Sequence, residues 1–112
     1  MDSPRASVLV IGGTGVFGSH LCRRLARLGL FKIIIAGRTQ SKAIPLIAEL
    51  AALDPGCNPR FMQINRKAVN ASMLKPLGLA AVVDAAGPFQ TGSWQVAQAA
   101  ITAQVNYIDL AD

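Results

Sequence analysis

The glycines near the start of the chain are the residues whose spacing most clearly indicates chemistry. They stand at positions 12, 13, 15 and 18, directly after the apolar run VLVI at 8–11. This spacing satisfies both G-x-G-x-x-G and G-x-x-G-x-x-G. A dinucleotide-binding turn needs glycine where the chain bends off a strand, where the backbone meets a diphosphate and where a helix packs on the sheet. We therefore expect a cofactor to contact Gly12, Gly13, Thr14, Gly15, Val16, Phe17 and Gly18.

The residues around these glycines support a binding turn. A strand pattern precedes them, and Phe17, Leu21, Leu25 and Leu28 then recur at helical spacing until Gly29. Backbone N–H groups at the start of such a helix face a bound phosphate, and the helix dipole favours its negative charge. This context favours a dinucleotide-binding turn over a tight turn that binds no ligand.

A second signal comes at the end of the next predicted strand. An NAD-binding unit usually has Asp or Glu there, which accepts hydrogen bonds from the ribose 2′-hydroxyl. This chain has AGRTQSK instead, with Arg38 twenty residues after Gly18. A guanidinium at this place can bind the 2′-phosphate of NADP through two hydrogen bonds. Arg38 and its neighbour Thr39 therefore favour NADP over NAD as the cofactor.

Strand and helix patterns alternate along the chain. Apolar or β-branched runs lie at 7–11, 31–36, 60–64, 80–85 and 105–110, and helical patterns lie at 17–28, 42–53, 70–77 and 93–103. This alternation predicts an α/β fold with a parallel sheet. Right-handed crossovers then give a doubly wound, Rossmann-like sheet of order 3-2-1-4-5. Its second half is incomplete, because the pattern stops before a sixth strand.

Composition narrows the class of protein and its partners. A chain of 112 residues suits one domain, 1–112, and its net charge of +5 suits an anionic ligand. The basic residues are scattered and not interleaved with aromatic ones, which argues against nucleic acid. No apolar run approaches the roughly 18 residues of a membrane span, and none has the length of a signal-peptide core. Cys22 and Cys57 lack metal or redox spacing, so we expect reduced thiols, no metal and a cytoplasmic location.

The last third of the chain carries a family resemblance. The stretch VVDAAGPFQTGSWQVAQAAITAQVNYIDLAD, with the AGRT segment and the glycine turn, resembles the saccharopine dehydrogenase-like family. Members are NAD(P)-linked oxidoreductases or relatives whose activity is unassigned. The resemblance implies that a small-molecule substrate binds a further substrate and dimerisation domain. It also implies that the nicotinamide side of the cofactor is bordered by Ala86, Gly87, Pro88 and Phe89.

Two residues depart from the pattern expected of such a domain. Asn65, followed by Arg66 and Lys67, stands where an acidic residue near the adenine is expected, and we keep Asn65 as a candidate adenine contact. Gln104 stands just past the fourth predicted helix, where relatives tend to have glycine. A left-handed backbone at Gln104 would cost on the order of 1 kcal/mol.

Three other interpretations remain open at this stage. Extended short-chain dehydrogenases also begin with a stretch like GGTGVFGSHL, but their Tyr-x-x-x-Lys pair has no match at Tyr107 and Ala111. The domain could also be an NmrA-like NADP sensor without catalysis, or a fold that binds no nucleotide. No nucleophile–base arrangement is visible, so we expect catalytic residues beyond Asp112, no activity in this chain alone, and self-association through the last strand.

Overall fold

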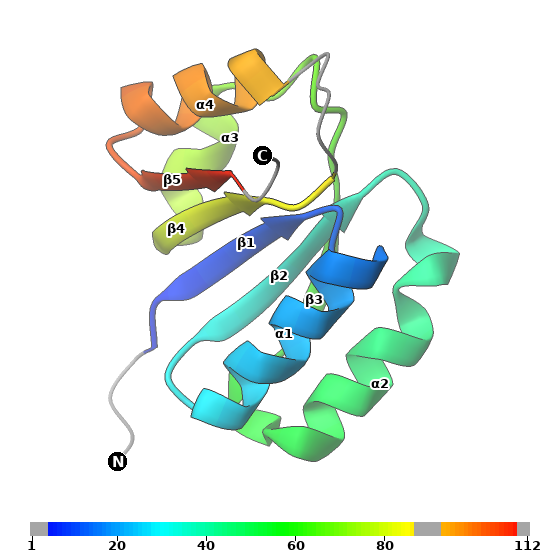
Figure 1. Cartoon of the computed structure of the whole chain (residues 1–112). Coiled ribbons are helices and arrows are strands. Elements are labelled where there is room, and N and C mark those ends of the chain that lie inside the picture. Colours follow the sequence, from blue (N-terminus) through cyan, green and yellow to red (C-terminus); the bar gives the residue numbers. More distant parts are fainter. Residues whose placement is uncertain (1–4, 87–92, 110–112) are drawn as a thin grey trace.

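A five-stranded parallel sheet with order β3-β2-β1-β4-β5 organises the chain (Figure 1). The structure is a computed structural model that describes residues 5–86 and 93–109. The strands are β1 (Ser7–Ile11), β2 (Lys32–Gly37), β3 (Arg60–Gln63), β4 (Leu79–Asp84) and β5 (Asn106–Asp109). The predicted fold class and strand order are therefore confirmed.

The helices form one layer on each side of this sheet (Figure 1). The α-helices are α1 (Val16–Leu28), α2 (Ile44–Leu53), α3 (Ala71–Leu74) and α4 (Ser93–Thr102). Three short 3₁₀ helices accompany them, namely η1 (Gln40–Lys42), η2 (Pro55–Cys57) and η3 (Lys75–Leu77). Side chains of α1 and α2 share one apolar cluster with the sheet, and side chains of α3 and α4 share the other.

Strand β1 lies at the centre of the sheet and is buried along its whole length. Successive side chains of a strand point to opposite faces. Val8 and Val10 accordingly belong to the cluster under α1 and α2, whereas Leu9 and Ile11 belong to the cluster under α3 and α4. Strands buried on both faces explain much of the 52% hydrophobic composition of so short a chain.

Two predicted helices differ in detail from the structure, and proline is involved in both. The second begins at Ile44 rather than near residue 42, because Gln40–Lys42 form η1, and Pro45 occupies the first turn as expected. The third was predicted as one segment over 70–77. It is instead divided into α3 and η3, with Pro76 at the start of η3, because proline cannot donate the N–H that would continue an α-helix.

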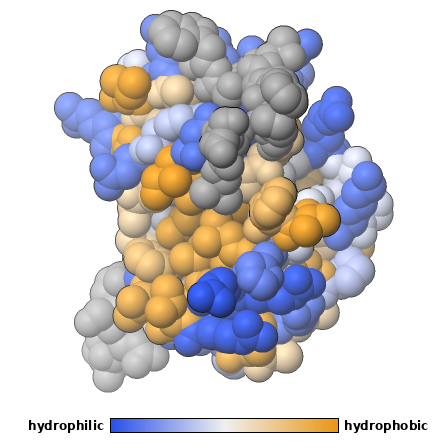
Figure 2. Space-filling model, viewed as in Figure 1, coloured by the Kyte–Doolittle hydropathy of each residue, from blue (hydrophilic) through white to orange (hydrophobic). Residues whose placement is uncertain are grey.

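Apolar side chains also remain on the surface. Figure 2 shows hydrophobic surface across the middle of the face on which Figure 1 shows β4 and β1, with hydrophilic surface over α1. Val16, Phe17 and Ile101 are each more than 70% exposed. None of the described helices is both long enough and apolar enough to cross a bilayer.

The end of α4 confirms the expected left-handed residue. Gln104 has φ +62°, its N–H donates to the carbonyl of Ile101, and the N–H of Val105 donates to that of Ala100. This pair of hydrogen bonds is the Schellman motif, in which glycine is preferred at the left-handed position because it has no Cβ. Gln104 therefore carries a conformational cost that glycine would remove.

We expect the substitution Gln104→Gly to raise the free energy of unfolding by about 1 kcal/mol. Urea denaturation should show a higher midpoint with an unchanged slope. Asn58→Gly is the matched control, since Asn58 also has a positive φ of 42° but asparagine tolerates this region better. A midpoint for Gln104→Gly equal to or below that of the wild type would contradict the expectation.

Candidate dinucleotide site

Three of the glycines after β1 are required by the packing of the chain itself. Gly12 has φ +77°, and a Cβ there would lie 2.6 Å from the Cα of Ala86. A Cβ on Gly13 would lie 2.8 Å from Cγ2 of Ile35, and a Cβ on Gly18 would overlap the carbonyl oxygen of Gly12. These glycines let the β1–α1 turn, the start of α1 and the turn after β4 approach one another at van der Waals distance.

Gly15 differs from the other three glycines. Its φ of −75° and ψ of 178° are accessible to any residue, and the nearest atom to an added Cβ would be the Gly12 carbonyl oxygen at 3.4 Å. Gly15 immediately precedes α1, and its position has no side-chain cap. The first N–H groups of a helix have no partner within the helix and suit an anion. The space at Gly15 is therefore consistent with a ligand, because no described residue comes closer to an added Cβ than the Gly12 carbonyl oxygen.

A pocket of about 380 Å³ lies at the carboxyl edge of the central strands, where ligands bind in doubly wound sheets. Segments that follow four different strands contribute to it. Its lining residues are Ile11, Gly12, Thr14, Gly37, Arg38, Thr39, Lys42, Ile64, Asn65, Arg66, Lys67 and Ala86. The topology thus brings together residues that are up to 75 positions apart in the sequence.

The charged residues that line this pocket are cations. They are Arg38, Lys42, Arg66 and Lys67, and none of the described lining residues is Asp or Glu. Arg38 directly follows β2, its side chain is exposed, and Gln63 Nε2 donates to its backbone carbonyl at 3.5 Å. A concave surface lined by one sign of charge concentrates ligands of the opposite sign. Phosphate groups are the ligand chemistry that this set of cations favours.

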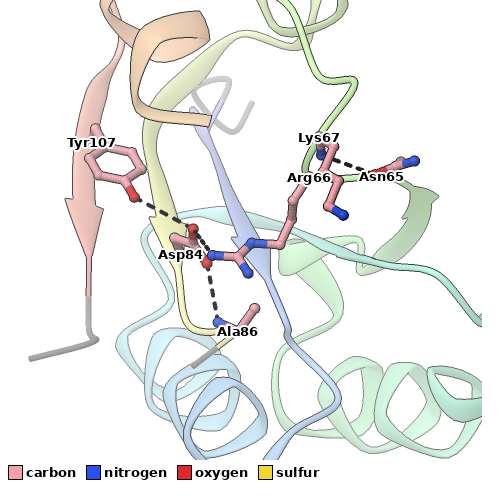
Figure 3. Close-up of polar contacts among 6 residues, drawn as sticks. All are labelled: Asn65, Arg66, Lys67, Asp84, Ala86 and Tyr107. Carbon is pink, nitrogen blue, oxygen red and sulfur yellow. Dashed lines mark hydrogen bonds and ion pairs between the residues drawn. The ribbon is translucent and has the colours of Figure 1, made fainter. Parts of the chain in front are cut away.

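The loop after β3 is shaped by Asn65. Its Oδ1 accepts a hydrogen bond from the backbone N–H of Lys67 at 2.9 Å (Figure 3). Its carbonyl accepts one from the N–H of Ala68 at 2.9 Å. This turn places Arg66 and Lys67 in the pocket wall. In the sequence, both cations stand out only as a departure from an expected acid. Their position directly after the third strand was the signal that they lie at the carboxyl edge.

A buried carboxylate connects two of these pocket segments. Asp84, the last residue of β4, is 1% exposed. Its Oδ2 accepts from Nη2 of Arg66 at 2.8 Å and from the hydroxyl of Tyr107 at 3.5 Å, and its Oδ1 accepts from the N–H of Ala86 at 3.2 Å (Figure 3). Arg66 is therefore the ion-pair partner of Asp84. Removing one partner of a buried ion pair typically costs about 3–5 kcal/mol.

Tyr107 lies behind this ion pair on β5. Burial, and after it the negative charges of Asp84 and Asp109, together raise the pKa of its hydroxyl to about 12. The phenol is therefore protonated at neutral pH and acts as a hydrogen-bond donor to Asp84.

The predicted site residues divide into three groups. Those that line the pocket are Gly12, Thr14, Arg38, Thr39, Asn65 and Ala86. Gly13 and Gly18 are buried behind the turn, whereas Gly15, Val16 and Phe17 are exposed at the start of α1 and do not line the pocket. Gly87, Pro88 and Phe89 lie outside the described residues. Within the described part of the chain, no three His, Cys, Asp or Glu side chains gather as a metal site would require.

Comparison with known proteins gives matches of different extent. A family model described as the saccharopine dehydrogenase NADP binding domain matches residues 8–112. Erythronolide synthase EryA3 of Saccharopolyspora erythraea is 42% identical over 55 residues, which are 46% of this chain and 2% of that protein.

Solved structures show the same fold. A putative short-chain dehydrogenase/reductase from Sinorhizobium meliloti 1021 is 25% identical with a TM-score of 0.58, over 74% of this chain and 40% of that one. An actinorhodin polyketide ketoreductase crystallised with NADPH is 23% identical with a TM-score of 0.58, over 75% of this chain and 34% of that one. The chain thus spans two-fifths or less of these relatives.

The family match covers nearly the whole chain, and the sheet order and glycine turn agree with an NADP-binding fold. The chain therefore belongs to the saccharopine dehydrogenase NADP-binding domain family.

Proposed function

We propose that this domain holds NADPH across the carboxyl edge of its sheet and is the cofactor-binding part of an oxidoreductase that acts on a small molecule. The observation that carries this proposal is the pocket lined by four cations and no acid, beside a glycine turn with open space at Gly15. The diphosphate lies at the turn of residues 12–18. The adenine lies near Asn65, and the nicotinamide side lies toward residues 86–89.

Arg38 and Thr39 bind the 2′-phosphate in this proposal. Both line the pocket directly after β2, and Lys42 adds a third polar group from η1. A carboxylate at this place would accept a hydrogen bond from a 2′-hydroxyl but would repel a 2′-phosphate. The exposed guanidinium of Arg38 has the opposite preference, so the site favours NADPH over NADH.

The domain's own residues bind and orient the cofactor, and other parts of the protein complete the reaction site. When bound, NADPH supplies a hydride. Among the described residues, the pocket lining holds no His, Cys, Asp, Glu or Tyr side chain that could exchange a proton with a substrate. We infer that a further part of the protein supplies the substrate site and the acid–base group. A sensor that binds NADPH without turnover would share the same pocket, and an assay of the whole protein for NADPH oxidation distinguishes the two.

The two cysteines support a reducing compartment. Cys22 and Cys57 are both buried and free. Burial, and after it the neighbouring Cys57, together raise the pKa of the Cys22 thiol to about 12. Neighbouring thiols that remain unpaired are typical of proteins from reducing environments. We infer a cytoplasmic location from them.

The last strand supports self-association. Strand β5 forms the edge of the described sheet and pairs with β4. Ile108 on β5 is 48% exposed, and Ile101 on the preceding helix is 72% exposed. An edge strand with exposed apolar side chains can pair with another chain. We infer that a second copy of the chain is the partner.

Sedimentation velocity of the purified chain should show a dimer whose fraction rises with concentration. Ile108→Lys should reduce that fraction, because a charge on an edge strand opposes pairing. A single monomeric species at every concentration would count against self-association.

For the 2′-phosphate site, we expect Arg38→Ala to weaken NADPH binding by about tenfold to hundredfold while NADH affinity changes less than about twofold. Isothermal titration calorimetry with both cofactors measures this. Arg60→Ala is the matched control, because Arg60 is an exposed cation on the neighbouring strand β3 and does not line the pocket. Equal affinities of the wild type for NADPH and NADH would overturn the assignment of Arg38.

For the glycine turn, we expect Gly15→Ala to weaken NADPH binding and Gly15→Val to abolish it, because the side chain fills the space that the diphosphate needs. Both variants should keep the far-UV circular dichroism and the urea midpoint of the wild type, since an added Cβ meets no atom of residues 5–86 or 93–109 closer than 3.4 Å. Unchanged affinity in Gly15→Val would show that Gly15 does not face the ligand.

A further inference from the structure

Arg66 is held in one place by a contact across the sheet edge. It follows β3, yet its Nη2 donates to Oδ2 of Asp84 on β4 at 2.8 Å, so the side chain extends past β1 (Figure 3). The side chain of Asp84 is fully buried and that of Arg66 is 20% exposed. A long cation that is normally mobile in solvent is therefore fixed in the wall of the pocket.

Arg66 and α1 lie toward opposite faces of the sheet. Val83 belongs to the cluster under α1 and α2, and Val82 belongs to the cluster under α3 and α4. Side chains alternate along a strand, so Asp84 shares the face of Val82 and receives Arg66 there. The glycine turn leads into α1 on the other face. An anion at the edge of β1 would therefore meet the start of α1 from one side and Arg66 from the other.

The guanidinium keeps donors for a ligand. Arginine has five N–H groups, and the contact with Asp84 is made by Nη2 alone. Nε is buried and has no hydrogen-bond partner among the described residues. Nη1 makes no hydrogen bond to any described residue and is not buried, so it is available to a ligand in the pocket. Guanidinium–phosphate contacts are charge-assisted and shorter than neutral hydrogen bonds.

Asp84 also fixes the neighbouring turn. Its Oδ1 accepts a hydrogen bond from the N–H of Ala86. The Cα of Ala86 lies so close to Gly12 that a Cβ on Gly12 would be 2.6 Å from it. The same carboxylate therefore sets the positions of Arg66 and of the segment that touches the glycine turn. This arrangement fixes the distance between the two sides of the diphosphate site.

We propose that Arg66 binds the diphosphate of NADPH from the α3–α4 side of the sheet, and that Asp84 is the positioning residue that holds it there. This rests on the proposed function, because it takes the diphosphate to lie at the glycine turn. Two of the four pocket cations then bind different phosphate groups. Arg38 binds the 2′-phosphate and Arg66 binds the diphosphate, so the two phosphate groups can be tested separately.

The test uses two nucleotides that each carry one of these groups. ADP has the diphosphate without a 2′-phosphate, and adenosine 2′-phosphate has the reverse. We expect Arg66→Lys to lower the affinities for ADP and NADPH by about tenfold or more. The affinity for adenosine 2′-phosphate should change less than about twofold. Lysine keeps the charge opposite Asp84, but its single ammonium cannot serve Asp84 and a phosphate with the geometry of a guanidinium. Arg38→Ala should give the opposite pattern.

Asp84→Asn tests the positioning role. Asparagine keeps an acceptor for the N–H of Ala86 but loses the charge that holds Arg66. We expect it to weaken ADP binding in the wild-type background and to have less than about a twofold effect in the Arg66→Lys background, because the two residues act through one contact. Urea denaturation of each variant measures stability separately. Loss of stability alone would lower the affinities for both nucleotides together.

The outcomes separate this proposal from the proposed function. Unchanged ADP affinity in Arg66→Lys, or equal losses for ADP and adenosine 2′-phosphate, would overturn the role of Arg66 while NADPH binding by the wild type still stands. Absence of NADPH binding by the wild type would overturn both. Arg60→Ala removes the same charge outside the pocket and should leave both nucleotide affinities within about twofold. A selective loss of ADP affinity in that control would attribute the effect to net charge and overturn the proposal.

Discussion

The backbone contact at Gly12 is the constraint on which the geometry of the site depends. Its position between Ala86 and the start of α1 leaves no room for a Cβ at Gly12 or Gly18. The N–H of Gly12 also donates to the carbonyl of Ala36 on β2 at 2.9 Å. The ends of β1, β2 and β4 are thereby fixed relative to α1 at the level of main-chain atoms. The main-chain positions from which these segments present their polar groups are therefore independent of side-chain rotation.

The buried carboxylate of Asp84 adds an electrostatic constraint to this frame. Moving a carboxylate out of water is costly, and a buried ion pair often contributes little net stability even when its geometry is good. The unpartnered Nε of Arg66 makes the pair less favourable still. The Asp84–Arg66 pair is better explained by the positions that it gives to Arg66 and Ala86 than by a contribution to the free energy of unfolding. A pair of apolar side chains would fill the same space without presenting a cation to the pocket.

Local patterns in the sequence were sufficient for the fold and for part of the site. The strand order follows from alternation of strands and helices, and the left-handed Gln104 follows from its place after α4. Arg38 and Thr39 could be named as candidates because they directly follow a predicted strand, and both line the pocket. The place of Arg66 could not be predicted, because it depends on a contact with a residue 18 positions later on another strand. No periodicity or motif encodes the direction in which a long side chain crosses a sheet edge.

The distribution of charge around the described pocket suits the binding of phosphate groups. Phosphate groups are bound best by permanent cations, and Arg38, Lys42, Arg66 and Lys67 supply these at neutral pH. A proton donor for a substrate needs the opposite property, a pKa near the working pH. Tyr107, the single tyrosine of the chain, has its pKa raised to about 12 and donates a hydrogen bond to Asp84, so it is a structural donor. Under the proposed function, the described pocket therefore holds phosphate groups, and the acid–base group comes from another part of the protein.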